Sequence, residues 1–186
     1  MAKYLFGPVF SRRLGISLGV DLVPHKVCSL NCIYCEAKAT SNLTLQRKEY
    51  VSFSKIIAEL TEFLKTNPPL DFITFSGAGE PLLNNKISEI IAFLKTNFPQ
   101  YKLALITNST LLSDENIRNE IKNIDLLLPS LDAVSSDVFK KINRPNRSRL
   151  SPPWHMMRVR SLALMRKERT ALIVTGSLEA RACSSG

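Results

Sequence analysis

The 186-residue sequence has no long apolar stretch, and none of its apolar runs approaches the ~18 to 20 residues that a bilayer-spanning helix needs. Residues 1–10 lack the basic start and apolar segment of a secretory signal. The sequence also lacks a Walker loop, a serine-triad arrangement and a DNA-binding helix. The first two absences predict a cytoplasmic protein with no membrane partner, and the third excludes three common kinds of active or binding site.

The composition is that of a folded protein. Apolar residues make up 45% of the sequence and charged residues 22%. A disordered chain has a smaller apolar share, because it buries too little surface to offset the entropy of ordering. A chain of this length has room for one ordinary domain with a real core. We therefore expect a single globular domain.

The positive charge is concentrated near the carboxyl end. Residues 1–147 contain 18 Lys and Arg against 14 Asp and Glu, whereas residues 148–186 contain 7 against 2. Lys outnumbers Arg before this point, and Arg outnumbers Lys after it. We predict a folded core over 1–147 and an atypical basic tail over 148–186, which is either a natural tail or the product of a changed reading frame. The net charge of +9 suggests an anionic partner such as RNA, and the division of the charge weakens that argument.

Strand-like and helix-like patterns alternate through the core. Short apolar runs predict strands, and apolar residues spaced three and four apart predict helices. Ser113, followed by Asp114 and Glu115, is typical of a helix N-cap with an acidic first turn. The predicted strands cover 16–22, 72–75, 103–106 and 124–128, and the predicted helices cover 53–64, 87–94, 114–121 and 138–142.

Buried strands joined by helices of this length indicate an α/β fold with a parallel sheet built from right-handed βαβ units. Four such units are visible, and the apolar run 171–174 is a candidate for a fifth strand. A closed eight-stranded barrel needs ~200 residues or more, which leaves a partial (β/α) barrel or a doubly wound sheet. In either fold, ligands bind at the carboxyl ends of the strands.

Small and polar residues follow the predicted strands at these ends. A segment with three cysteines follows the first strand, and Ser76–Glu80 follows the second. Thr107–Ser109 follows the third strand and Ser130–Asp132 the fourth. Together these segments predict a ligand site along one edge of the sheet.

Cys28, Cys32 and Cys35 lie within eight residues. Three thiols this close together in a cytoplasmic protein indicate a soft metal site, either zinc or an iron-sulfur cluster. A zinc site would take a fourth ligand, for which His25 and Cys183 are candidates. Three cysteines without a dependable fourth ligand favour a cluster with one open iron, where a substrate or cofactor could bind.

The C-x3-C-x2-C spacing, with the aromatic Tyr34 just before the last cysteine, resembles the radical S-adenosylmethionine superfamily. The segments 6–24, Ser76–Pro81 and Pro129–Val134 further resemble a branch of iron-sulfur oxidoreductases related to the tRNA wyosine synthesis enzymes. The resemblance runs from about residue 6 to residue 147. It implies a partial (β/α) barrel with a radical S-adenosylmethionine site.

By this resemblance, the three cysteines hold a 4Fe-4S cluster whose open iron binds S-adenosylmethionine. One-electron reduction by a flavodoxin-like or ferredoxin-like donor cleaves this cofactor to methionine and a 5′-deoxyadenosyl radical, which abstracts hydrogen from the substrate. A tRNA base is the substrate class that the resemblance favours, and no catalytic residue is assigned. The implied cofactor contacts are Tyr34 beside the adenine, Gly77, Ala78, Gly79 and Glu80 at the methionine ammonium, and Asn108, Ser130 and Asp132 near the ribose or the methionine carboxylate.

These positions also have ordinary structural explanations. Glu80 before Pro81 is typical of a loop acid, and Asn108 and Ser130 are typical of strand-end capping. Ala78 departs from the family's Gly-Gly-Glu motif, which makes Glu80 the strongest candidate of that segment. The alternative function is a noncatalytic module in which zinc or an iron-sulfur cluster serves structure or RNA binding.

Overall fold

The structure, a computed structural model, describes residues 3–133, 135–146 and 171–172. Within them, no helix is long and apolar enough to cross a membrane. The main feature is a six-stranded sheet whose strands, in spatial order, are β1 (Leu5–Ser11), β2 (Gly15–Val20), β5 (Phe72–Phe75), β6 (Lys102–Thr107), β7 (Leu126–Pro129) and β8 (Ala171–Leu172). β1 is antiparallel to β2, and all other neighbouring pairs are parallel.

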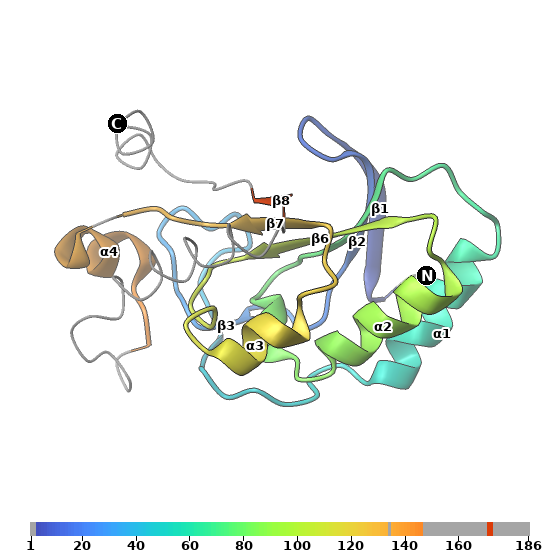
Figure 1. Ribbon diagram of the computed structural model, residues 1–186. Coiled ribbons are helices and arrows are strands. Elements are labelled where there is room, and N and C mark those ends of the chain that lie inside the picture. Colours follow the sequence, from blue (N-terminus) through green and yellow to red (C-terminus); the bar gives the residue numbers. More distant parts are fainter. Residues whose placement is uncertain (1–2, 134, 147–170, 173–186) are drawn as a thin grey trace.

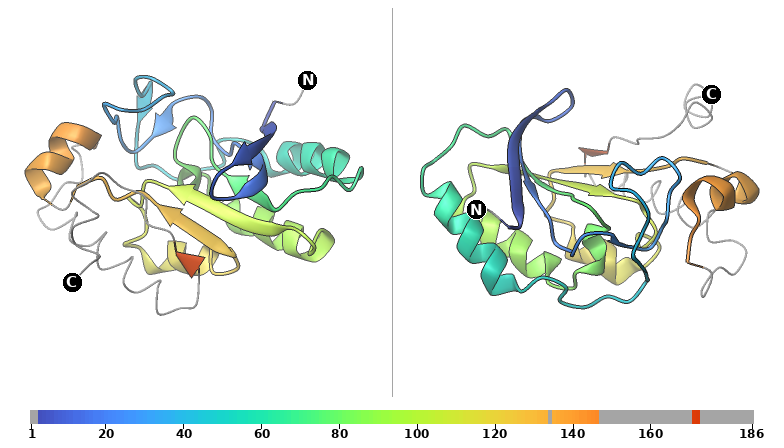
Figure 2. Two further views of the ribbon diagram at one scale, coloured as in Figure 1. Left: turned by 90° about the horizontal axis from the view of Figure 1, so that it is seen from above. Right: turned by 180° about the vertical axis from the view of Figure 1, so that it is seen from behind.

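Helices cover one face of the sheet. Figure 1 shows α1 (Phe53–Leu64), α2 (Ile87–Asn97) and α3 (Glu115–Glu120) together below it. The helix α4 (Ser136–Asn143) lies beyond the carboxyl end of β7, and β8 extends the sheet past β7 (Figure 2). Alternating strands and helices with a mostly parallel sheet confirm the predicted α/β class, and β8 falls in the run proposed as a fifth strand.

Large aliphatic side chains fill the space between the sheet and the helices. Leu18, Ile73 and Leu103 are aligned on β2, β5 and β6, and all three are fully buried. Ile56 and Leu60 of α1 belong to the same cluster. Burial of each such side chain stabilises the fold by about 1.5–3 kcal/mol. The apolar stripes that predict the helices are therefore the surfaces that attach them to the sheet.

On the opposite face of the sheet, β2 and β5 carry smaller and more polar side chains. Ser17 on β2 and Thr74 on β5 share a buried hydrogen bond of 2.6 Å between their hydroxyl oxygens. A Cβ atom built on Gly19 would lie 2.1 Å from the ring of Phe6, so this glycine gives the ring room against the strand. Ile106 of β6 is 37% exposed. Such a face leaves space above the sheet for a ligand.

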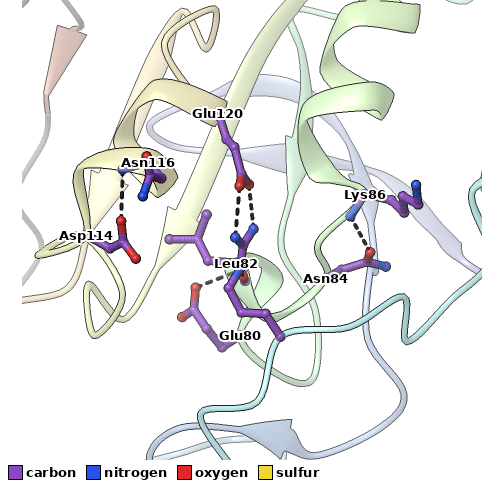
Figure 3. Close-up of polar contacts among 8 residues, drawn as sticks. Glu80, Leu82, Asn84, Lys86, Asp114, Asn116 and Glu120 are labelled. Atoms are coloured by element: carbon purple, nitrogen blue, oxygen red, sulfur yellow. Dashed lines mark hydrogen bonds and ion pairs between the residues drawn. The ribbon is translucent and has the colours of Figure 1, made fainter.

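Several elements differ from the expectation, among them β1, β2 and α3. The strand β1 was not predicted, because its residues are mostly exposed and show no apolar alternation. The strand predicted over 16–22 ends at Val20. The α3 cap is Asp114 rather than Ser113, because the Asp114 carboxylate accepts the Asn116 N–H at 2.9 Å (Figure 3).

Candidate functional site

The segment after β2 that carries the cysteines is held by backbone hydrogen bonds to α4. Cys28 ends the short strand β3 (Val27–Cys28), which is parallel to β4 (Asn42–Leu43). The Asn31 N–H donates to the carbonyl of Asn143 at 2.9 Å, and the Ile33 N–H donates to the carbonyl of Ile142, also at 2.9 Å. The cysteine segment is therefore fixed by a helix that lies far from it in the sequence.

Each of the three thiols accepts a hydrogen bond from one side-chain nitrogen, and all three cysteines are half-buried. The donors come from three different parts of the chain. The bonds are Asn108 Nδ2 to Cys28 Sγ at 3.4 Å, Asn143 Nδ2 to Cys32 Sγ at 3.2 Å, and Lys26 Nζ to Cys35 Sγ at 3.1 Å. Donors aimed at sulfur stabilise thiolates and tune the potential of a bound iron-sulfur cluster.

Two of the thiols, those of Cys28 and Cys32, are protonated at neutral pH in the metal-free chain. Burial, and then the charge of Glu80, raises the pKa of Cys28 to about 11. Burial also raises the pKa of Cys32, against the bond from Asn143. A metal would displace these protons, because thiolates are the binding form.

The donor set fits an iron-sulfur cluster. In the described part of the chain, no three His, Cys, Asp or Glu side chains gather closely enough to enclose a single metal ion. The cysteines of a 4Fe-4S site bind separate irons, so such a site does not require its thiols to meet at one point. Three half-buried thiols in one loop, each with its own N–H donor, are suited to that soft, multi-iron group.

Asp132 is hydrogen-bonded to Tyr34 and is 8% exposed. Its Oδ2 accepts hydrogen bonds from the Tyr34 hydroxyl and from Asn143 Nδ2, the latter at 2.6 Å. Burial and then the bond to Asp132 raise the pKa of Tyr34 above its ordinary value. The structure thus joins two predicted cofactor residues, with Asp132 holding the Tyr34 side chain in place.

Glu80 is 1% exposed, and its carboxylate accepts hydrogen bonds from the protein itself. Oε1 accepts the Thr107 hydroxyl at 2.6 Å. Oε1 also accepts the Leu82 N–H at 3.2 Å (Figure 3). Oε2 accepts the Asn108 N–H at 2.7 Å. The carboxylate therefore ties the turn after β5 to the end of β6, and it fixes the residue that donates to Cys28.

The small residues before Glu80 pack against the chain's own backbone. A Cβ atom on Gly79 would lie 2.1 Å from the Val27 carbonyl oxygen, and one on Gly77 would lie 2.2 Å from the Asp21 carboxyl carbon. The Lys26 N–H donates to the Ala78 carbonyl at 3.1 Å. The glycines are needed because this segment lies directly against the residues that lead into the cysteine loop.

An open cleft of about 760 Å³ lies beside these groups. Of the predicted cofactor residues, Tyr34, Gly77 and Ala78 are on its wall, as is the predicted cluster ligand Cys35. The described residues that line this cleft do not include the other predicted cofactor residues. Those residues are Gly79, Glu80, Asn108, Ser130 and Asp132.

Ser130 takes part in the same edge of the sheet. Its N–H donates to the Thr107 carbonyl at 2.8 Å, and its carbonyl accepts the Ser109 hydroxyl at 3.2 Å. It joins the ends of β6 and β7. The carboxyl ends of the parallel strands thus meet as the sequence predicted.

Several residues of the site were missed from the sequence, among them Lys26, Asn143 and Asp21. Lys26 and Asn143 donate to cysteine sulfurs, and Asp21 is on the cleft wall. Asn143 follows Cys32 by 111 residues, and no spacing links the two. The position of Lys26, two residues before Cys28, was the one available signal.

The Radical SAM superfamily model matches residues 22–167, which is more than half of the chain. The chain belongs to the radical SAM superfamily. Enzymes of this superfamily use a 4Fe-4S cluster and S-adenosylmethionine.

Two curated relatives resemble this radical SAM chain in sequence. A Brachyspira hyodysenteriae protein named GTPase Obg is 44% identical over 147 residues, which are 78% of this chain and 21% of that protein. A UPF0026 protein of Methanocaldococcus jannaschii is 39% identical over 145 residues, 76% of this chain and 44% of the relative. The radical SAM chain thus spans less than half of the length of either relative.

The fold is also similar to that of a solved structure, TYW1 with a lysine-pyruvate adduct bound. The TM-score is 0.58 at 16% identity, over 88% of this chain and 56% of that one. Radical SAM structures of this kind have a partial barrel. The likeness confirms the partial (β/α) barrel that the resemblance implied.

Proposed function

We propose that this chain binds a 4Fe-4S cluster through Cys28, Cys32 and Cys35 and uses it to cleave S-adenosylmethionine reductively. The observation that carries the proposal is the arrangement of the three thiols. Each accepts one side-chain N–H, and Cys35 also faces the cleft that Tyr34, Gly77 and Ala78 line. The proposed cluster ligands therefore lie next to the proposed cofactor site.

The cleft suits a small cofactor. Its volume of about 760 Å³ is within the ~300–1,000 Å³ typical of small-molecule sites. Tyr34, held by Asp132, offers an aromatic surface for the adenine, and the small residues at 77 and 78 allow close approach to the backbone. When bound, the cluster supplies an electron that splits the sulfonium and gives a 5′-deoxyadenosyl radical.

The remaining predicted residues act by holding this arrangement. Glu80 fixes Asn108 and Thr107, while Ser130 links the ends of β6 and β7. This support differs from the direct contact with the methionine ammonium that the resemblance implies for Glu80. We propose that Glu80 contributes to cofactor binding through Asn108.

The proposal extends to partners and domain limits. A flavodoxin-like or ferredoxin-like donor supplies the electron, and a tRNA base is the proposed substrate class. The likeness in fold to TYW1 and the net charge of +9 support that class. We propose residues 1–147 as the cofactor-binding core and 148–186 as an atypical basic tail, from which β8 joins the sheet beside β7.

A cysteine panel tests the cluster. After anaerobic reconstitution, Cys28→Ala, Cys32→Ala and Cys35→Ala should each lose the cluster's iron, sulfide and brown absorption, because each removes one ligand. Cys183→Ala is the matched control and should retain the wild-type iron content. Equal loss in Cys183→Ala would indicate a four-cysteine site and contradict the open-iron mechanism.

The reaction is tested on the same protein. With dithionite and S-adenosylmethionine, the reconstituted wild type should release methionine and 5′-deoxyadenosine, and the three ligand variants should not. A wild type that binds zinc and no cluster would support the noncatalytic module instead. A wild type that carries the full cluster but does not cleave S-adenosylmethionine would overturn the proposed reaction and would still support the proposed cluster site.

A further inference from the structure

Lys26 is a buried lysine in the turn that leads into the cysteine loop. It is 3% exposed, and its backbone is fixed on both sides. Its N–H donates to the Ala78 carbonyl at 3.1 Å, and its carbonyl accepts the Ser41 and Asn42 N–H groups. The direction of its side chain is therefore set by the surrounding chain.

The Lys26 ammonium is directed at Cys35. Nζ lies 3.1 Å from Sγ, and in the described residues it makes no ion pair with a carboxylate. A buried cation is costly unless an anion compensates it, and a neutral thiol is only a weak acceptor. A thiolate bound to iron supplies the missing negative charge.

The other two thiols have uncharged donors. Asn108 and Asn143 offer amide N–H groups to Cys28 and Cys32, so the full positive charge lies on the Cys35 side. This is also the side that faces the cleft. The electrostatic effect of Lys26 on the bound group therefore exceeds that of either amide.

We propose that Lys26 sets the reduction potential of the cluster, an inference that rests on the proposed function. With three thiolate ligands, the oxidised cluster carries a net negative charge. One electron from a flavodoxin-like or ferredoxin-like donor adds one more unit of negative charge. The fixed ammonium attracts the reduced form more strongly than the oxidised form. Lys26 therefore raises the potential and eases reduction, acting through the cluster and not on the substrate.

The test is a spectroelectrochemical titration of the reconstituted full chain, with iron content measured in parallel. Lys26→Met should shift the oxidised-to-reduced equilibrium at least tenfold toward the oxidised form, which lowers the midpoint potential by 59 mV or more for one electron. Lys26→Arg, which keeps the charge, should remain close to wild type. Lys38→Met is the matched control, because Lys38 is exposed, lies three residues after Cys35 and shares the positive φ of Lys26 (68° against 61°).

The outcomes separate this inference from the proposed function. A wild type without a cluster refutes the proposed function. A wild-type cluster whose potential is the same in Lys26→Met, or shifts equally in Lys38→Met, overturns the role of Lys26 alone. If the melting temperature of the cluster-free protein shows that Lys26→Met does not fold, Lys26→Gln replaces it. A potential that falls as far in Lys26→Arg as in Lys26→Met also overturns the inference, because arginine supplies the same charge.

Discussion

At the residue scale, a variant of Glu80 can distinguish a supporting role of this residue from direct contact with the cofactor. Its carboxylate accepts the Thr107 hydroxyl and the N–H groups of Leu82 and Asn108 in a buried site. In Glu80→Gln, the new amide NH2 would face one of these donors and leave it unsatisfied. We expect the free energy of unfolding to fall by about 1–3 kcal/mol, measured by chemical denaturation of the cluster-free protein.

Glu62→Gln is the control for Glu80→Gln. The Glu62 side chain is 78% exposed and pairs with Lys65, so the same change there should cost less than about 0.5 kcal/mol. Unchanged stability of Glu80→Gln, together with weaker binding of S-adenosylmethionine, would return Glu80 to the direct ammonium contact that the resemblance implies.

The sequence indicated the three proposed metal ligands but not the side chains that donate hydrogen bonds to them. Cys28, Cys32 and Cys35 are close in the sequence, and their spacing alone indicates a metal. Asn143 reaches Cys32 only because the chain passes through the parallel strands β5, β6 and β7 between the two residues. Such a contact has no local pattern. The topology predicted a ligand site at the strand ends, and the resemblance assigned the individual cofactor positions, so neither specified the hydrogen-bond partners of each residue.

At the element scale, the N-cap of α3 is Asp114 and not the preceding Ser113. Asp114 Oδ1 accepts the Asn116 N–H, whereas Ser113 lies before the cap. Asp114→Ala should lower the free energy of unfolding by about 0.5–2 kcal/mol, because it removes the acceptor and an acidic group near the helix N-terminus. Ser113→Ala should change it by less than about 0.5 kcal/mol. Denaturant titration of both variants decides this, and the reverse order would make Ser113 the cap.

Elements with strong periodicity were predicted well. The helix α1 covers the expected residues 53–64, because Ile56, Leu60 and Leu64 form one buried stripe. The strand β1 gave no such signal, since it lies at the edge of the sheet and most of its residues are exposed. Its position depends on pairing with β2 rather than on an apolar pattern of its own.

At the scale of the whole molecule, Asp21 makes stability depend on pH. Burial raises its pKa above the ordinary value of 3.8, against the N–H groups of Ala78 and Val23 and the charge of His25. A raised carboxyl pKa means that the folded state binds the proton more tightly than the unfolded state. The contribution to stability is therefore present below about pH 3.8 and is lost as the pH rises through the folded-state pKa.

Asp21→Asn removes this dependence. The stability of the cluster-free wild type, measured relative to Asp21→Asn by denaturation between about pH 3 and pH 7, should decline as the pH rises. Asp137→Asn removes the same charge from a side chain that is 88% exposed and serves as the control. A difference between wild type and Asp21→Asn that stays constant, or rises, would contradict the assigned shift.

The attachment of the cysteine loop to α4 has a consequence for the order of events during synthesis. Asn143 follows Cys32 by 111 residues, which a ribosome adding ~5 to 20 residues per second makes in roughly 6 to 22 s. Until then, the newly made cysteine loop lacks the helix α4 that holds it in the folded protein. Thiol labelling of ribosome-bound chains that end before and after α4 would follow this change in protection. We expect iron to enter only after α4 is made, so the newly made thiols pass through an interval in which oxidation and other metals compete for them.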